Sequence, residues 1–294
     1  MSRFSLEQSG ISYIRSGPQD SKVALVCVHG WACQATDYTY LFTELNKTVP
    51  LKFQAVAVDL PGHGKSSTKS YPVASISAFA EAVNAVANEL GFLEIVLVGH
   101  SMGMRVVLEA WQQTLATTAT SIVKGVIFLD GSHYKFRKSL FAFDKADPRS
   151  KNLNAEEVKE KIAEAFSQMF SSRTPPEFQA STLAHAKSID AEYNESMRQS
   201  HISYDYERLD DVLAEMGKAS IPLLNLQATH IDEQNQRIPL KQGEVTQWMR
   251  FLQEKVPQAQ QFVIPGSSHF LHVDDPAGVA RRIMEFVDGL DERF

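Results

Sequence analysis

The residues Gly99-His100-Ser101-Met102-Gly103 decide how this sequence folds. They follow the apolar run 94–98, which predicts a buried strand, and they precede a helical pattern that begins near Arg105. A Gly-x-Ser-x-Gly motif between a strand and a helix is typical of a nucleophile elbow. Its glycines allow a sharp turn and a close approach of helix and strand. We therefore expect the Ser101 hydroxyl to stand exposed at the edge of a sheet.

A second signal lies upstream, in the apolar run 23–28, which predicts a strand buried on both faces. This run ends in His29-Gly30-Trp31, a loop that can direct the backbone N–H of Trp31 toward the serine. Together with the N–H of Met102 it would form an oxyanion hole, because backbone donors are aimed before charge develops on a carbonyl oxygen. His29 is interpreted mainly as a residue that ties down the loop. Both His29 and His100 are candidates for contact with a substrate.

His269 is the candidate general base. It lies in Pro265-Gly266-Ser267-Ser268-His269-Phe270, after the strand-like run 261–264. A base for serine needs a pKa near neutrality and a loop at the same edge of the sheet. His272 is the alternative, and His269 is favoured because it lies nearer the end of the strand.

The segment 59–66, Asp59-Leu60-Pro61-Gly62-His63-Gly64-Lys65-Ser66, directly follows another strand-like run. Its glycines and proline indicate a tight loop at a strand end. No cluster of metal ligands surrounds His63 in the sequence, so we interpret the segment as structural. Neither a metal nor an organic cofactor is expected.

Taken in this order, the motifs resemble those of the α/β-hydrolase superfamily. The resemblance rests on His29-Gly30-Trp31, the loop 59–66, the elbow 99–103, and His269 before Asp275-Pro276. It extends over nearly the whole chain. It implies a catalytic triad in the order nucleophile, acid, histidine, and a mostly parallel eight-stranded sheet with helices on both faces and a helical cap. One such fold hosts many chemistries, so the substrate does not follow from it.

Two aspartates compete for the place of the triad acid. Asp130 ends the apolar run 126–129 and is followed by glycine, whereas Asp232 lies beyond the run 221–226 and has Glu233 beside it. Most of the superfamily places the acid after the later strand, which favours Asp232. Some members use the earlier position, including the cofactor-independent dioxygenases that open hydroxyquinolone rings. We favour Asp130 because a carboxylate at a strand tip has the simpler geometry, and Asp232 stays open. Either would orient the imidazole.

The alternation of strand and helix patterns predicts the architecture of the core. Two short strands near 4–6 and 11–15 should form an antiparallel start, joined by a turn at 8–10. Expected helices follow between later strands, at 36–48, 76–90, 104–115, 244–255 and 277–290. This alternation predicts a parallel sheet covered on both faces, with the site at the carboxyl ends of its strands.

The interval 134–217 breaks that alternation. We expect a helical cap here, inserted after the sixth strand, and an α/β-hydrolase core formed by 1–133 and 218–294. Pro175-Pro176 and the stretch 201–203 should divide the cap into three or four helices. Its aromatic residues could form an apolar ceiling over a substrate or pack within the cap; they are Phe136, Phe141, Phe143, Phe166, Phe170 and Tyr204.

The composition is that of a soluble enzyme. The chain has 294 residues, 44% of them hydrophobic, enough for one large core. A net charge of −6 offers no long-range attraction to nucleic acid or anionic lipid. No apolar stretch approaches the roughly 20 residues of a membrane span, and residues 1–7 lack an apolar signal core. Two cysteines, Cys27 and Cys33, exclude a disulfide framework and favour a cytoplasmic location.

These patterns predict acyl transfer without a cofactor. Ser101 would attack an apolar ester or lactone, a small molecule, while His269 takes its proton. A cofactor-independent dioxygenase is a second possibility, although Cys33 and Met102 stand about where such enzymes carry further histidines. A non-catalytic receptor for a small molecule is the third. A haloalkane dehalogenase is disfavoured, since those enzymes have aspartate in place of Ser101.

Overall fold

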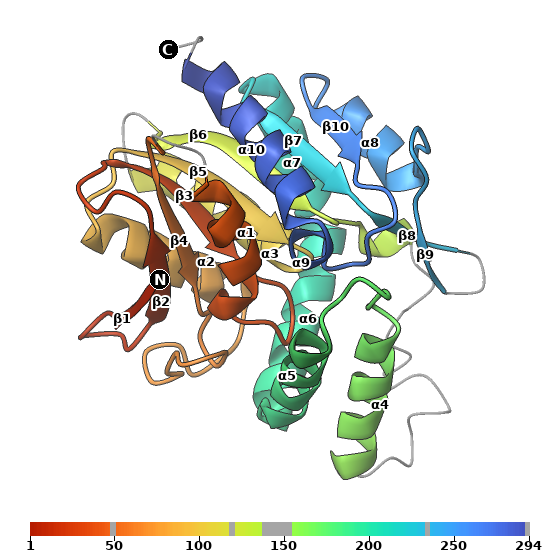
Figure 1. Ribbon diagram of the computed structural model, residues 1–294. Helices are drawn as coiled ribbons and strands as arrows, with labels where there is room; N and C mark the ends of the chain where they lie inside the picture. Colours follow the sequence, from red (N-terminus) through yellow and green to blue (C-terminus); the bar gives the residue numbers. More distant parts are fainter. Residues whose placement is uncertain (48–50, 118–120, 137–154, 233–235, 292–294) are drawn as a thin grey trace.

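The computed structural model describes residues 1–47, 51–117, 121–136, 155–232 and 236–291. Its centre is an eight-stranded sheet in the order β1-β2-β4-β3-β5-β6-β7-β10 (Figure 1). The strands are β1 Ser2–Ser5, β2 Ser12–Ser16, β3 Val23–Val28, β4 Gln54–Val58, β5 Glu94–His100, β6 Val123–Leu129, β7 Leu223–Gln227 and β10 Gln260–Val263. A separate hairpin joins β8 Thr229–Ile231 to β9 Arg237–Pro239.

The sheet is mostly parallel, as the sequence predicts. β2 pairs antiparallel with β1 and β4, whereas the neighbours from β4 to β10 are all parallel. β3 and residues 95–98 of β5 are apolar because helices cover both faces of the sheet. Parallel strands also bring their carboxyl ends to one edge.

Helices on the two faces build two separate parts of the core. On one face α2 Ile76–Glu89 packs against α3 Gly103–Thr117, with Phe79 and Trp111 fully buried. On the other face α1 Thr39–Leu45 packs against α10 Pro276–Asp291, and Phe42 and Phe286 are buried in this part of the core. The remaining elements here are η1 Ala35–Tyr38, α8 Gln247–Lys255 and α9 Leu271–Asp274.

The expected helices of the core are present with shifts of a few residues. The predicted helix 36–48 begins instead with the 3-10 turn η1, and α8 begins at Gln247 because the side chain of Thr246 caps it by accepting from Met249 N–H at 3.1 Å. The predicted helix 277–290 corresponds to α10.

Among the described residues between β6 and β7, four helices and one short 3-10 turn are present. They are η2 Tyr134–Phe136, α4 Ala155–Ser167, α5 Pro176–Ser188, α6 Ala191–Glu207 and α7 Leu209–Lys218. In Figure 1, α4, α5 and α6 extend beyond the edge of the sheet. The division into a core and a cap stays a prediction.

The predicted break at 201–203 is wrong. α6 continues through these residues to Glu207, since His201, Tyr204 and Asp205 are buried and their packing outweighs the weak helix propensity of the stretch. The break before α6 comes at Asp190, whose side chain accepts from the N–H groups of Glu192 and Tyr193. The break at Pro175-Pro176 is confirmed, because α5 begins at Pro176.

Candidate active site

The elbow holds Ser101 in a strained backbone conformation. Its φ of +55° lies in the left-handed region that non-glycine residues rarely adopt. The turn is possible because the flanking residues are glycines: a Cβ on Gly103 would lie 2.4 Å from Val28 O, and one on Gly99 would lie 2.5 Å from Gly103 O. Such strain persists only where surrounding structure enforces it, and it is common at functional sites.

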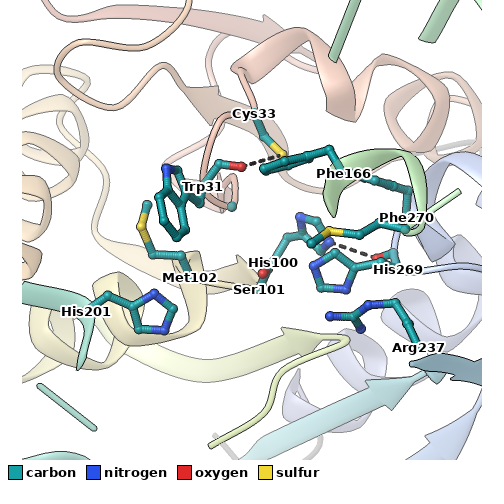
Figure 2. Close-up of a pocket in the computed structure, with 12 residues that line it drawn as sticks. Trp31, Cys33, His100, Ser101, Met102, Phe166, His201, Arg237, His269 and Phe270 are labelled. Carbon is teal, nitrogen blue, oxygen red and sulfur yellow. Dashed lines mark hydrogen bonds between the residues drawn. The ribbon is translucent and has the colours of Figure 1, made fainter. Parts of the chain in front are cut away.

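The loop after β3 lies directly against the elbow. A Cβ on Gly30 would come within 2.9 Å of Ser101 Cβ, so only glycine allows this approach. Trp31 and Met102, the two predicted oxyanion donors, line the same pocket as Ser101 (Figure 2). The Trp31 side chain reaches further and donates through Nε1 to Asn194 Oδ1 on α6 at 2.6 Å.

His269 also lines this pocket, and it is paired with Asp130. The distance between His269 Nδ1 and Asp130 Oδ2 is 2.7 Å, and both residues are buried. This bond makes Nδ1 the donor and Nε2 the basic nitrogen of a neutral imidazole. His272, the alternative base, does not line the pocket. It stacks on Tyr38 with ring centroids 4.9 Å apart, and burial lowers its pKa to about 3.

Asp130 accepts an unusually large number of hydrogen bonds. Its Oδ1 accepts from Gln227 Nε2 at 2.9 Å and from the backbone N–H groups of Ala228 and Thr229 at 2.9 and 2.8 Å. Its Oδ2 accepts from Thr229 Oγ1 at 2.5 Å and from Arg237 Nη1 at 3.0 Å, besides His269. Burial alone would raise the pKa of this carboxyl. The bond to His269 and the charge of Arg237 outweigh it, so the pKa is lowered.

Asp232, the competing acid, lies at the end of the β8–β9 hairpin. Its Oδ1 accepts from the backbone N–H of Gln236 at 2.8 Å, and its own N–H donates to Gln236 O. It does not line the pocket with Ser101. The structure therefore joins His269 to the aspartate after β6.

The two histidines proposed for substrate contact differ. His100 lines the pocket, and its Nε2 lies 2.9 Å from His269 O, so it helps to fix the histidine loop. His29 does not line the pocket, contrary to its prediction as a substrate-binding residue. Its Nδ1 lies 2.8 Å from Gly30 O and its Nε2 accepts from Leu60 N–H at 3.0 Å, which ties the loop down. Burial lowers the pKa of His29 to about 3 and keeps it neutral.

The loop 59–66 has the structural role expected of it. Asp59 is fully buried; it accepts from the N–H groups of Ala35 and Lys65 and pairs with Arg3. His63 Nδ1 lies 3.0 Å from Pro61 O.

The aromatic residues expected over the site do not all line the same pocket. Phe166 lines the pocket together with Met169, another apolar residue of the inserted segment. Phe170 stacks instead on Phe270 at 5.3 Å, and Phe136 lines a different cavity. Phe141 and Phe143 lie outside the described residues.

A buried ion pair behind the elbow has no counterpart in the sequence-based expectations. Arg105 on α3 donates to both oxygens of Asp205 on α6, each at 2.6 Å, and both side chains are fully buried. Arg105 Nη1 also donates to Ser101 O at 3.2 Å. The only signal in the sequence is the position of Arg105 in the first turn after the elbow.

The described residues contain no group of three or more His, Cys, Asp or Glu side chains that could hold a metal ion. No helix in this part of the chain is long and apolar enough to cross a membrane.

Comparison with known proteins identifies the family to which the chain belongs. The model of the alpha/beta hydrolase family matches residues 25–282. An uncharacterized hydrolase of Bacillus subtilis (strain 168) is 30% identical over 111 residues, which are 37% of this chain and 38% of the relative. The matched segment thus spans well under two thirds of that relative's length.

Two solved structures illustrate the shared fold. A hydrolase from Oleispira antarctica superposes with a TM-score of 0.70 at 17% identity, over 94% of both chains. A putative aryl esterase from Burkholderia cenocepacia gives a TM-score of 0.71 at 16% identity, over 96% of this chain and 95% of that one. Such identities support the fold alone.

The match of the family model over most of the chain makes this protein a member of the alpha/beta hydrolase family. The fold class predicted from the sequence is confirmed by the family match and by the observed sheet.

Proposed function

We propose that this protein is a serine hydrolase that cleaves apolar carboxylic esters or lactones through an acyl-enzyme on Ser101. The observation that carries the proposal is the 2.7 Å contact between His269 Nδ1 and Asp130 Oδ2, in a histidine that lines one pocket with Ser101. A buried carboxylate in this position holds the imidazole in the tautomer that accepts a proton at Nε2.

The proposed reaction has two halves. Ser101 Oγ attacks the carbonyl carbon while its proton passes to His269 Nε2, and the oxyanion is held by the backbone N–H groups of Trp31 and Met102. The imidazolium then protonates the leaving alkoxide as the ester bond breaks. Water attacks the acyl-enzyme with His269 again as base, and the acid leaves as Ser101 recovers its proton.

An apolar substrate suits the wall of the pocket. Side chains of Trp31, Met102, Phe166, Met169 and Phe270 contribute to it. Its volume is only about 20 Å³, about one water molecule in this measure, so a substrate must displace side chains. Phe166 belongs to α4, and we propose that the segment 134–217 acts as a cap that moves when substrate enters.

We also propose that the partner is this small apolar substrate alone, with no nucleic-acid or membrane partner and a cytoplasmic location. The net charge of −6 supports the first part.

The direct test uses a fluorophosphonate probe and mass spectrometry. We expect the probe to modify Ser101, and Ser101→Ala to abolish both labelling and turnover of a panel of esters and lactones. The matched control is Ser121→Ala, which changes a part-buried serine before β6, at the opposite end of the strands. It should stay labelled and active. Labelling elsewhere, or normal turnover by folded Ser101→Ala protein, would contradict the proposal.

A second candidate function is a cofactor-independent dioxygenase. The favouring observation is that His269 pairs with the aspartate after β6. Such an enzyme would use the His269–Asp130 pair to deprotonate a substrate hydroxyl and would form no acyl-enzyme. Oxygen consumption with heteroaromatic hydroxy substrates that survives Ser101→Ala would favour it.

A non-catalytic receptor for a small molecule would instead show binding and at most a single turnover.

A further inference from the structure

A second cavity lies behind Asp130. It has a volume of about 280 Å³, compared with about 20 Å³ for the pocket at Ser101. Its wall comes from the segment 131–136 after β6, the β7–β8 region, Arg237 on β9, and residues 245–250 at the start of α8. An apolar cavity of about 150 Å³ accepts benzene. This one therefore has room for an aromatic ring with a polar substituent.

The polar groups around this cavity are incompletely paired. Four side chains that line it carry a buried polar atom without a hydrogen-bond partner: Gln227 Oε1, His230 Nδ1, Arg237 Nε and Trp248 Nε1. Gln227 and Trp248 are 3% and 4% exposed, and the Arg237 side chain is 8% exposed. Burying a polar group without a partner is unfavourable, so clusters of such groups are rare in the absence of a ligand.

The charges around the cavity favour an anion. Arg237 and Arg250 line it, and none of the described lining residues is acidic. Arg237 Nε and Trp248 Nε1 are donors, and α8 presents its N-terminal turn here with the positive end of its dipole. Phe136 and Trp248 add aromatic surface.

Three residues of the wall also hold Asp130. Gln227 Nε2 donates to Oδ1, Arg237 Nη1 donates to Oδ2, and Thr229 donates to both oxygens. A ligand that accepts a hydrogen bond from Arg237 therefore changes how strongly the guanidinium charge stabilises the Asp130 carboxylate.

We propose that this cavity is a second binding site, for a small aromatic carboxylate, and that Arg237 couples its occupancy to the Asp130–His269 pair. The ligand's carboxylate lies among the Arg237, Trp248 and Arg250 donors, and its ring packs on Phe136 and Trp248.

The binding test is titration calorimetry with benzoate and with benzamide, its neutral isostere. Benzoate should bind about tenfold tighter, because charged acceptors strengthen each donated hydrogen bond. Trp248→Phe, which removes one N–H donor but retains an aromatic ring, and Arg250→Gln should each weaken benzoate about fivefold to tenfold. Arg281→Gln, an exposed arginine of α10 away from the cavity, is the control and should bind as wild type does. Equal binding of benzoate and benzamide, or wild-type affinity in both cavity variants, would overturn the site.

The coupling test is proton NMR of the His269 Nδ1–H resonance during the benzoate titration. We expect the resonance to shift in the wild type, and Arg250→Gln to require about fivefold to tenfold more benzoate for the same shift. Binding that leaves the resonance unmoved would overturn the coupling. Neither measurement requires hydrolytic activity, so failure here and failure of the proposed hydrolase are distinguishable.

Discussion

Two buried Arg–Asp pairs flank the elbow, and they differ in what else the aspartate holds. Arg105 and Asp205 are fully buried and form a two-fold contact, with both distances 2.6 Å. Arg237 contacts Asp130 through a single 3.0 Å hydrogen bond. Asp130 also accepts hydrogen bonds from His269 and from the β7–β8 region. The first pair connects α3 to α6, whereas the second adjusts a carboxylate beside the candidate base.

The comparison shows that a buried Arg–Asp pair can have either of two roles. A bidentate pair has little freedom to rearrange, and it suits a permanent connection between the elbow and the inserted helices. A carboxylate that accepts hydrogen bonds from both a guanidinium and an imidazole suits a partner that gains and loses a proton.

The largest expected effect separates Asp130 from Asp232. Asp130→Asn should lower kcat by about 10⁴-fold, as a comparable change does in a serine protease, because the wrong imidazole tautomer becomes populated. Asp232→Asn should change kcat little, since Asp232 does not line the pocket with Ser101 and bonds to Gln236 within its hairpin. Ester hydrolysis at matched folded fraction measures both.

An inactive Asp232→Asn beside an active Asp130→Asn would reverse this assignment. Activity in both variants would point to Glu233.

The second-largest expected effect concerns the Arg105–Asp205 pair. Asp205→Asn leaves the Arg105 charge buried without its counter-ion, and we expect a loss of about 3–5 kcal/mol in the free energy of unfolding. Asp210→Asn is the matched control, because Asp210 pairs with Lys135 and His133 while its side chain is 41% exposed. It should cost about 1 kcal/mol or less. Urea denaturation compares the two, and equal losses would show that burial does not distinguish them.

The same pair predicts an acid-sensitive component of stability. The charge of Arg105 outweighs burial and holds the pKa of Asp205 at about 2, below its ordinary 3.8. A lowered folded-state pKa means that the stabilisation is complete above the unfolded pKa and is lost as pH falls from about 4 through about 2. Its size is about 2 kcal/mol at 1.36 kcal/mol per pKa unit. Unfolding free energies across this window should vary less in Asp205→Asn, and an unchanged slope would refute the assignment.

The smallest expected effect concerns the neutral hydrogen bond between Trp31 and Asn194 on α6. Asn194→Ala removes the acceptor of Trp31 Nε1, so it should cost about 1 kcal/mol of stability. Because Trp31 lines the pocket, KM for apolar esters should change more than kcat. Asn84→Ala, which removes an amide that bonds to α3 away from the pocket, is the control for stability alone. A change in kcat with constant KM would contradict this role of Trp31.

The fold was predictable because its strongest signals are local. The strand from Val23, the elbow around Ser101 and the loop before His269 each combine an apolar run with a turn of glycine or small residues, and their order defines the sheet edge. The prediction of a helix break at 201–203 was wrong. The local helix propensity is weak there, but the burial of Tyr204 and Asp205 keeps the helix continuous. Tertiary packing decided between them.

By itself, the sequence determined the candidate nucleophile, the histidine, the loop that faces them and two aspartates that could complete the set. Only the tertiary structure brought one of these aspartates to 2.7 Å from His269, and only it placed Arg237 beside that carboxylate and Arg105 beside Asp205. The physical reason is the range of the interactions. Turns and strands depend on neighbouring residues, whereas the partners of a buried charge lie about 100 residues away and leave no periodic pattern.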